Sequence, residues 1–244
     1  MRINKTFVIG DIHGGLKALI EVLDKAKTGV EDTLIFLGDY VDGWSQSPEV
    51  LNYLISLKEH KKCIFIRGNH DSLLLNYLKT NTFHEEWKKH GGKSTIDSYQ
   101  KIDLQTISKH IDFLENLSDF YLDTENRLFL HAGFTNLKGV EFEHFKPLLY
   151  WDRSLWEMAL SLDPKLVRED NFYPDRLKLY KEIFIGHTPV TKIGTTIPVN
   201  KACIWNVDTG AAFFGPLTIM DIETKEFWQS NPLHLLYPDE IGRN

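Results

Sequence analysis

The stretch FVIGDIHGG, residues 7–15, runs from a short apolar segment of β type straight into Asp11 and His13, two side chains that bind cations well. The same transition follows in LIFLGDYVDG at 34–43 and in IFIRGNHD at 64–71. Between these runs the apolar residues recur every three or four positions, which predicts amphipathic helices. The resulting β-α-β-α-β order predicts parallel strands, whose carboxyl ends line the usual ligand crevice. We therefore expect the chemistry of this chain at those strand ends.

The rest of the chain divides into a helical part and a β-rich part. Residues 72–118 are polar with helical periodicity, which predicts a helical layer or cap, and Glu125-Asn126 suits a hairpin turn. The later β-type runs predict a second sheet: FYLDT at 120–124, LFLHAG at 128–133, IFIGH at 183–187, ACIWNVD at 202–208, LTIMDI at 217–222 and EFWQS at 226–230. Because the sequence has no internal repeat and no convincing linker, we interpret residues 1–244 as a single domain with a C-terminal tail from about 226.

Composition limits the classes of function. The chain has 244 residues, of which 42% are hydrophobic, and a formal net charge of -6 with a pI near 5.9. This acidic balance argues against non-specific nucleic-acid binding, which needs a basic surface. No apolar run reaches ~18 residues, so no membrane span is expected. The first β-type run leaves no room for a secretory segment, and Cys63 and Cys203 are expected to be buried thiols, so we expect a reducing, cytoplasmic location.

Six side chains of the metal-binding kind follow the apolar runs: Asp11, His13, Asp39, Asn69, His131 and His187. Hard oxygen and imidazole donors without a thiolate suit a pair of divalent cations better than a closed structural zinc site. A carboxylate such as Asp39 can bridge two ions through its two oxygens. Two cations ~3.5–4 Å apart can share a hydroxide and clamp the attacking and leaving oxygens of a phosphoryl displacement. These residues therefore predict phosphoester hydrolysis.

His70 and Asp42 are expected to act on the substrate rather than to bind a metal. His70 directly follows Asn69, and adjacent residues near a strand end tend to point in different directions. An imidazole near the leaving oxygen can act as a general acid, and Asp42 can keep that imidazole protonated and oriented. We predict that His70 and Asp42 form a catalytic pair.

The chain resembles the calcineurin-type metallophosphoesterases in five ordered motifs: GDIHG at 10–14, GDYVDG at 38–43, GNHD at 68–71, HAG at 131–133 and GHTP at 186–189. The narrower resemblance is to the PPP serine/threonine phosphatases and their bacterial and phage relatives. It implies an α/β (α+β) fold of four layers, a β-sandwich of two mixed sheets with helices on both outer sides. It also implies a dinuclear centre, often filled by manganese, iron or zinc, and of these we expect manganese.

The same resemblance distributes the ligands between two ions. It implies Asp11, His13 and Asp39 at the first ion, and Asp39, Asn69, His131 and His187 at the second. The stretch HGGKSTIDSY at 90–99 is also similar to one found in bacterial members, where it follows an aromatic residue, here Trp87. His90 starts a flexible segment, 90–95, that could overhang the site.

One position departs from the family pattern. Members usually read GDxVDRG, with an arginine that grips the substrate phosphate, whereas this chain has Gly43 followed by Trp44. Because a guanidinium contributes both affinity and charge stabilisation, its loss needs compensation. Arg153 is our first candidate for substrate binding, and Asn69 is expected to contribute as well. Arg67 is the reserve, although its counterpart in the family favours a structural role. We expect Trp44 to pack in the core or at its rim, although an aromatic residue at this position could also shape a pocket that stacks a base or a peptide ring.

Three functions compete on this basis. The expected one is a metal-dependent phosphomonoesterase of the serine/threonine protein phosphatase type, acting on phosphoproteins. The alternative is a hydrolase of nucleotides or dinucleoside polyphosphates, which related bacterial members cleave, and the Gly43-Trp44 replacement favours it slightly. The third is a scaffold of the same fold without catalysis, against which the intact ligands and the Asp42–His70 pair argue. The expected partner is a phosphorylated substrate, not a nucleic acid or a membrane, and the sequence does not indicate the oligomeric state.

Overall fold

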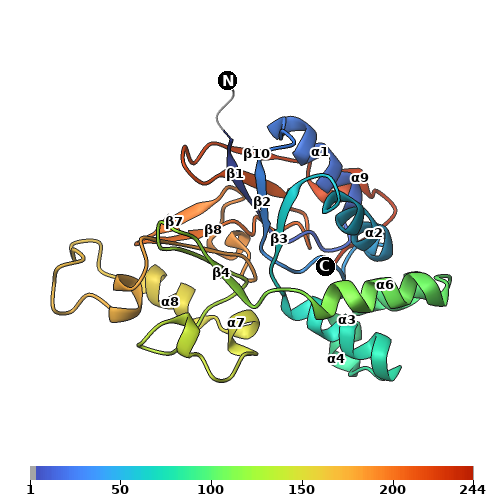
Figure 1. Cartoon of the computed structure of the whole chain (residues 1–244), viewed down its shortest axis with the longest axis horizontal. Coiled ribbons are helices and arrows are strands. Elements are labelled where there is room, and N and C mark those ends of the chain that lie inside the picture. The colour runs from blue at the N-terminus through green and yellow to red at the C-terminus, as the bar shows by residue number, and fades with distance from the viewer. Residues whose placement is uncertain (1–3, 244) are drawn as a thin grey trace.

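Two five-stranded β-sheets form the centre of the protein, with helices on their outer faces (Figure 1). The structure, a computed structural model, describes residues 4–243. The first sheet has the order β10-β9-β1-β2-β3, with the strands β1 (Thr6–Ile9), β2 (Thr33–Phe36), β3 (Lys62–Phe65), β9 (Thr218–Asp221) and β10 (Phe227–Gln229). Strands β1, β2 and β3 are parallel, as the β-α-β-α-β pattern predicts, and β9 and β10 extend the sheet in antiparallel orientation.

The second sheet is also mixed. Its order is β4-β5-β6-β8-β7, with the strands β4 (Phe120–Leu122), β5 (Arg127–Leu130), β6 (Glu182–Ile185), β7 (Val199–Lys201) and β8 (Ile204–Asn206). Strands β5, β6 and β8 are parallel, and β4 and β7 pair antiparallel at the edges. The hairpin between β4 and β5 turns at Asn126, whose φ is 61°. Two mixed sheets flanked by helices confirm the predicted fold class.

Apolar side chains cover both faces of the central strands. In β1, Val8 lies in the core between the two sheets, whereas Phe7 and Ile9 lie in the outer core under the helices. From the second sheet, Phe129 and Phe184 join the inner core and stack on each other with ring centroids 4.9 Å apart. A strand buried on both faces appears in the sequence as a continuous apolar run. The inner core shared by both sheets supports the proposal of a single domain.

The helices pack on the outer faces of the sheets (Figure 1). The first sheet is covered by helices from the first half of the chain and by one near its end: α1 (Leu16–Ala26), α2 (Ser47–Leu57), α3 (Asn69–Thr80), α4 (Glu85–Trp87), the distorted turn η1 (Lys88–Gly92), α5 (Lys93–Tyr99), α6 (Leu104–Glu115) and α9 (Leu233–Leu236). The second sheet is covered by α7 (Leu148–Trp151) and α8 (Ser154–Ser161), and the chain also forms the 3₁₀ turns η2 (Val140–Phe142), η3 (Asp175–Lys178) and η4 (Val190–Ile193). Within residues 4–243, no helix is both long and apolar enough to cross a membrane.

One expectation about the end of the chain is wrong. The runs at 217–222 and 226–230 form β9 and β10, which belong to the first sheet rather than to the second. The segment from 226, which we predicted as a C-terminal tail, begins with β10 paired to β9, and its residues Leu233 and Tyr237 are buried in the outer core. Local alternation indicates that a run is a strand, but its pairing partner depends on long-range contacts that the run itself does not encode.

His110 connects the helices that support the predicted overhanging segment. Its Nε2 lies 3.0 Å from Asn52 Oδ1 on α2, and its Nδ1 lies 2.8 Å from the hydroxyl of Tyr99 on α5. Since an amide oxygen only accepts, Nε2 carries the hydrogen and Nδ1 accepts from the tyrosine. Burial lowers the pKa of His110 to about 4, so the folded protein keeps this ring neutral.

We expect His110 to make folding stability depend on pH. Its folded pKa lies below the value of 6.5 that is usual for histidine, so its contribution is complete above pH 6.5 and is lost as the pH falls toward 4. Between pH 7 and pH 4 the loss should be ~2 kcal/mol of unfolding free energy. Urea unfolding of metal-free wild-type protein and of His110→Gln measures the difference, because glutamine keeps both hydrogen bonds without titrating. Parallel pH profiles for the two proteins would contradict the assignment.

Candidate active site

The six predicted ligands lie in five loops that follow strands of the two sheets. Asp11 and His13 follow β1, Asp39 follows β2, Asn69 follows β3, His131 follows β5 and His187 follows β6, and all six are buried. The carboxyl ends of parallel strands meet at one edge of each sheet, which explains how residues so far apart in sequence converge. The structure thus brings together every residue that the sequence nominated as a metal ligand.

The donors fall into two groups that share one carboxylate. Each group places one donor atom per residue within 4.8 Å: Asp11, His13 and Asp39 in the first, and Asp39, His131 and His187 in the second. Oδ2 of Asp39 lies 3.6 Å from Nε2 of His13 and 3.4 Å from Nε2 of His131. Asn69 Oδ1 completes the second group, 3.1 Å from His131 Nε2 and 2.9 Å from His187 Nδ1. This is the division between two ions that the resemblance implies.

The backbone orients two of the imidazoles toward the centre. Nδ1 of His13 lies 3.1 Å from the carbonyl of Val41, and Nδ1 of His131 lies 2.7 Å from the carbonyl of Leu37. A ring that donates its Nδ1 hydrogen to a carbonyl presents the lone pair of Nε2 on its other side, as metal-binding histidines do. In His131 this Nε2 faces the oxygen of Asn69, and either a proton on Nε2 or a cation between the two atoms satisfies both of them. The donor set therefore fits divalent cations.

The charges of the ligands lead to the same conclusion. Burial alone would raise the pKa of Asp39, but the imidazoles of His131 and His70 outweigh it and hold this pKa well below its usual range. Burial alone would lower the pKa of His131, but the carboxylate of Asp39 raises it to about 10. Burial and the charge of Asp208 raise the pKa of Asp11 well above its usual range. A protonated His131 thus provides part of the positive charge that cations would bring.

Four residues of the site have left-handed backbone conformations. The φ angles are 52° for His13, 53° for Asp39, 75° for Asp42 and 68° for His187. Non-glycine residues rarely adopt these angles, at a cost of ~1–3 kcal/mol each, and they persist only where the surrounding structure enforces them. Strain of this kind concentrates at functional sites, and here it falls on Asp42 and on three of the predicted ligands.

Asp71 is a positioning residue that the sequence analysis did not single out. Its buried carboxylate accepts hydrogen bonds from the backbone N–H groups of Gly68 at 2.8 Å, Asp39 at 2.9 Å and Tyr40 at 2.9 Å. Burial and the charge of Asp39 raise the pKa of Asp71 to about 7. Gly68 is required here, since a Cβ atom would collide with the backbone nitrogen and Oδ1 of Asp39. The last residue of GNHD therefore joins the loops after β2 and β3.

The predicted pair of His70 and Asp42 is in contact. His70 Nδ1 lies 2.5 Å from Asp42 Oδ2, and the indole of Trp87 donates to the same oxygen at 2.5 Å. The backbone N–H of Asp42 donates to Thr95 Oγ1 at 3.0 Å, and that of His70 donates to Asp39 Oδ1 at 2.9 Å. With Nδ1 engaged, His70 has Nε2 left for a substrate. Trp87 and Thr95 flank the glycines of HGGKST, and Trp87 holds the carboxylate of Asp42 while Thr95 holds its backbone.

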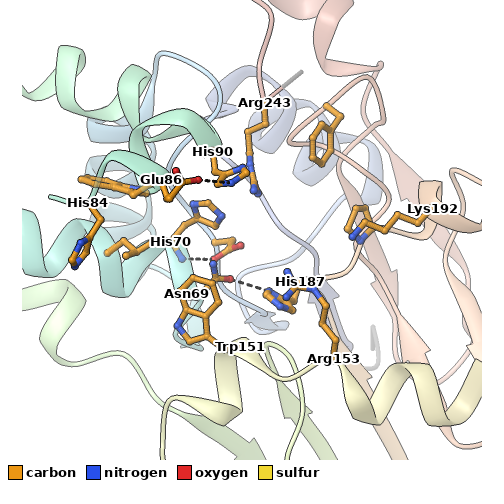
Figure 2. Close-up of a pocket in the computed structure, with 15 residues that line it drawn as sticks. Asn69, His70, His84, Glu86, His90, Trp151, Arg153, His187, Lys192 and Arg243 are labelled. Atoms are coloured by element: carbon orange, nitrogen blue, oxygen red, sulfur yellow. Dashed lines mark hydrogen bonds and ion pairs between the residues drawn. The ribbon is translucent and has the colours of Figure 1, made fainter.

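A cavity of about 500 Å³ lies against Asn69, His70 and His187 (Figure 2). Its lining includes three basic and two aromatic side chains: Arg153, Lys192, Arg243, Trp151 and Phe213. His90 also lines the cavity, and its Nε2 lies 3.7 Å from a carboxylate oxygen of Glu86, whereas residues 91–95 are not part of the lining. Arg153 and Trp151 lie across the cavity from Arg243 and His90 (Figure 2). Arg153 thus lies where a substrate-binding residue is expected.

Arg67, the reserve candidate for substrate binding, does not line the cavity. Its guanidinium donates to the carbonyl of Leu114 at 3.0 Å and to that of Leu117 at 3.2 Å, and its Nε lies 3.6 Å from Asp119 Oδ1. These bonds join the end of β3 to the end of α6. Carbonyls at a helix C-terminus need donors, and Arg67 provides them. Its role is structural.

Trp44 packs in the core, as expected, and does not line the pocket. The ring is fully buried, stacks on Tyr237 and donates from Nε1 to the carbonyl of Ala211 at 2.7 Å. The aromatic side chains that do line the cavity include Trp87, Trp151 and Phe213. Phe213, Lys192 and Arg243 were missed in the sequence because they lie outside the motifs, and no local pattern distinguishes them from ordinary surface residues.

Comparison with known proteins agrees with this geometry. The model of the calcineurin-like phosphoesterase family matches residues 5–215. The chain belongs to this family. Members of the family are hydrolases with a divalent metal centre, and this chain has Asp and His residues suitably placed for one. The chain is therefore a metallophosphoesterase.

The relatives of this metallophosphoesterase include enzymes with different substrates. It is 28% identical over 242 residues to the asymmetrical bis(5'-nucleosyl)-tetraphosphatase PrpE of Oceanobacillus iheyensis, covering 91% of this chain and 90% of that one. It is 36% identical over 110 residues to the serine/threonine-protein phosphatase PP1-1 of Saccharomyces cerevisiae, covering 43% and 35%. A solved structure of a candidate diadenosine tetraphosphatase superposes with a TM-score of 0.63 at 18% identity, over 93% and 92% of the two chains. The last similarity demonstrates a shared fold.

The two arginines nominated from the sequence should respond differently to substitution. Arg153→Ala is expected to lower kcat/KM by about 10²-fold with an unchanged melting temperature, because it removes a guanidinium from the cavity. Arg67→Ala is expected to lower the unfolding free energy by ~2 kcal/mol, because helix-end carbonyls lose their donors, with kcat/KM changed less than ~3-fold. Kinetics on an aryl phosphate and thermal melts of both variants test this. A larger catalytic loss for Arg67→Ala would contradict the placement.

Proposed function

We propose that this metallophosphoesterase hydrolyses nucleotides, with dinucleoside polyphosphates as its substrate class. The observation that carries the proposal is the lining of the cavity. Arg153, Lys192 and Arg243 offer positive charge along a chain of phosphates. Trp151 and Phe213 offer rings on which bases can stack. A phosphoserine side chain would use one end of this lining, whereas a polyphosphate with two nucleosides would use all of it.

The relatives support the nucleotide alternative better than the protein phosphatase expected from the motifs. The similarity to the bis(5'-nucleosyl)-tetraphosphatase spans about nine tenths of both chains, whereas that to the serine/threonine-protein phosphatase covers less than half of either. If substrate specificity depends on the whole cavity, relatives with the same specificity should be similar in sequence beyond the residues of the metal-donor groups. The partner we propose is therefore a nucleotide rather than a phosphoprotein.

The roles of the residues follow from their positions. Two divalent ions, which we expect to be manganese with iron or zinc as substitutes, would provide an activated water and balance charge on the phosphoryl oxygens. Asn69 belongs to the second donor group and also lines the cavity, so it can contact the same phosphate. Arg153 binds a phosphoryl oxygen from the far side. His70, oriented by Asp42, donates a proton to the leaving oxygen.

A panel of substrates under one metal condition tests the proposal. Purified protein with manganese should hydrolyse dinucleoside polyphosphates with a kcat/KM at least ~10-fold above that for any phosphoserine or phosphothreonine peptide, since only the nucleotides engage both the charged and aromatic lining. A chelator should abolish turnover, and manganese should restore it. A preference for phosphopeptides would return the protein to the phosphatase class, and turnover that survives verified metal removal would exclude the metal-dependent mechanism.

The role of His70 predicts a dependence on the leaving group. His70→Asn should lower kcat by about 10²–10³-fold for an alkyl phosphate, whose leaving oxygen needs a proton, and by less than ~10-fold for an activated aryl phosphate. Asp42→Asn should show the same selectivity with a smaller loss, because the imidazole remains but is less well oriented. Single-substrate kinetics with both compounds measure the ratio. Equal losses on the two substrates would rule out proton donation by His70.

A further inference from the structure

The last residues of the chain pack against the loop that carries Gly43. Trp44 stacks on Tyr237, with ring centroids 5.3 Å apart and an interplanar angle of 24°. The next residue, Ser45, donates from its backbone nitrogen and its hydroxyl to the two carboxylate oxygens of Glu240, at 2.9 and 2.7 Å. The hydroxyl of Tyr237 donates to Gln46 Oε1 at 2.6 Å. The residues from 44 to 46 therefore all bind the segment 237–243.

This docking brings Arg243 over the site. Its backbone N–H donates to the carbonyl of Ala212 at 2.9 Å, which aims the side chain toward the cavity that it lines. The stem of Arg243 occupies space that two glycines leave open. A Cβ atom on Gly43 would lie 3.3 Å from Arg243 Cγ, and one on Gly91 would lie 2.7 Å from the same atom. The two glycines are hydrogen bonded to each other, from Gly43 N to Gly91 O at 3.1 Å.

The guanidinium of Arg243 is available for a ligand. Its Nε is buried and has no hydrogen-bond acceptor among residues 4–243. Its Cζ lies 5.5 Å from the ring centroid of Phe213, a cation–π contact that engages the face of the guanidinium rather than its N–H donors. Leaving a buried charged donor unpaired is costly, so an anion in the cavity would stabilise this arrangement.

We infer that Arg243 is a phosphate-binding residue of this enzyme and that the packing of the segment 237–243 places it beside Gly43. The side chain enters the site beside the backbone of Gly43, where this sequence lacks an arginine. Arg153 lies on the opposite side of the cavity (Figure 2), so the two guanidinium groups would flank a phosphate bound between them. Each can donate two parallel hydrogen bonds to phosphoryl oxygens and balance the charge that develops during transfer. The inference rests on the proposed phosphoester hydrolysis but not on the choice of nucleotide.

Variants at position 243 test this role. Arg243→Ala in the manganese-loaded enzyme should lower kcat/KM for an aryl phosphate by about 10²-fold and weaken the binding of inorganic phosphate, measured by calorimetry, by about 10-fold or more. Arg243→Lys should recover part of both losses, because it keeps the charge without the fork of donors. The matched control is Arg168→Ala, whose guanidinium donates to the carbonyls of Lys178 and Tyr180 outside the cavity and whose loss should leave both quantities unchanged.

Manganese content and melting temperature of each variant separate binding from structure. Phosphate affinity and kcat/KM within ~2-fold of wild type in Arg243→Ala would overturn the inference. So would a loss of manganese that accounts for the weaker binding, because Arg243 would then support the metal centre. If the wild-type protein turned over no phosphoester, the proposed function would fail, while the phosphate calorimetry would still decide the role of Arg243.

A substitution of Glu240 tests whether the segment 237–243 positions Arg243. Glu240→Gln removes the charge from the bonds to Ser45 and should reduce kcat/KM by several-fold in the wild-type background, because Arg243 is then held less firmly. In the Arg243→Ala background the same change should have no further effect, since the two residues act through one group. Equal reductions of kcat/KM in both backgrounds would mean that the segment influences catalysis independently of Arg243. That result would overturn the inference that the segment positions Arg243.

Discussion

The buried carboxylate of Asp39 is the group on which the rest of the site depends. It belongs to both groups of metal donors, and its Oδ1 also accepts the backbone N–H of His70. Its backbone carbonyl accepts from Ile12 and His13, at 3.0 and 2.9 Å, and its backbone nitrogen donates to Asp71. Three loops from three strands therefore meet at one residue. A buried charge with so many neighbours is stable only when it is paired, by the protonated His131 or by cations.

The two-sheet architecture explains how such a convergence can be exact enough for chemistry. In β1 the side chains of Phe7, Val8 and Ile9 alternate between two different cores. A slip of one residue would exchange the contents of these cores, so the register of the strand is strongly determined. Because the register of β1 is fixed, the positions of Asp11 and His13, which follow the strand, are fixed as well. The left-handed conformations of His13 and Asp39 add local strain that the packed strands support.

The residues proposed for the reaction and those proposed for substrate specificity come from different parts of this chain. The metal donors, His70 and Asp42 come from the ordered motifs next to the strands. The cavity that would select a substrate is lined by side chains from elsewhere: Trp151 at the end of α7, Arg153 before α8, Lys192 in η4, and Phe213 and Arg243 near the end of the chain. Conservation of chemistry with variation of substrate is the expected result, because loops and chain ends tolerate change better than buried strands.

The sequence by itself determined the parallel first sheet, the position of the chemistry at strand ends and the set of ligands that converge there, because apolar periodicity and short motifs act over a few residues. Only the tertiary structure decided the rest. It placed β9 and β10 in the first sheet, assigned Arg67 to helix-end carbonyls and buried Trp44 against Tyr237. It also brought Arg243 to Gly43, two hundred positions away in the chain. These outcomes depend on which surfaces meet after the strands pair. Residues far apart in sequence carry no local pattern that predicts such a contact.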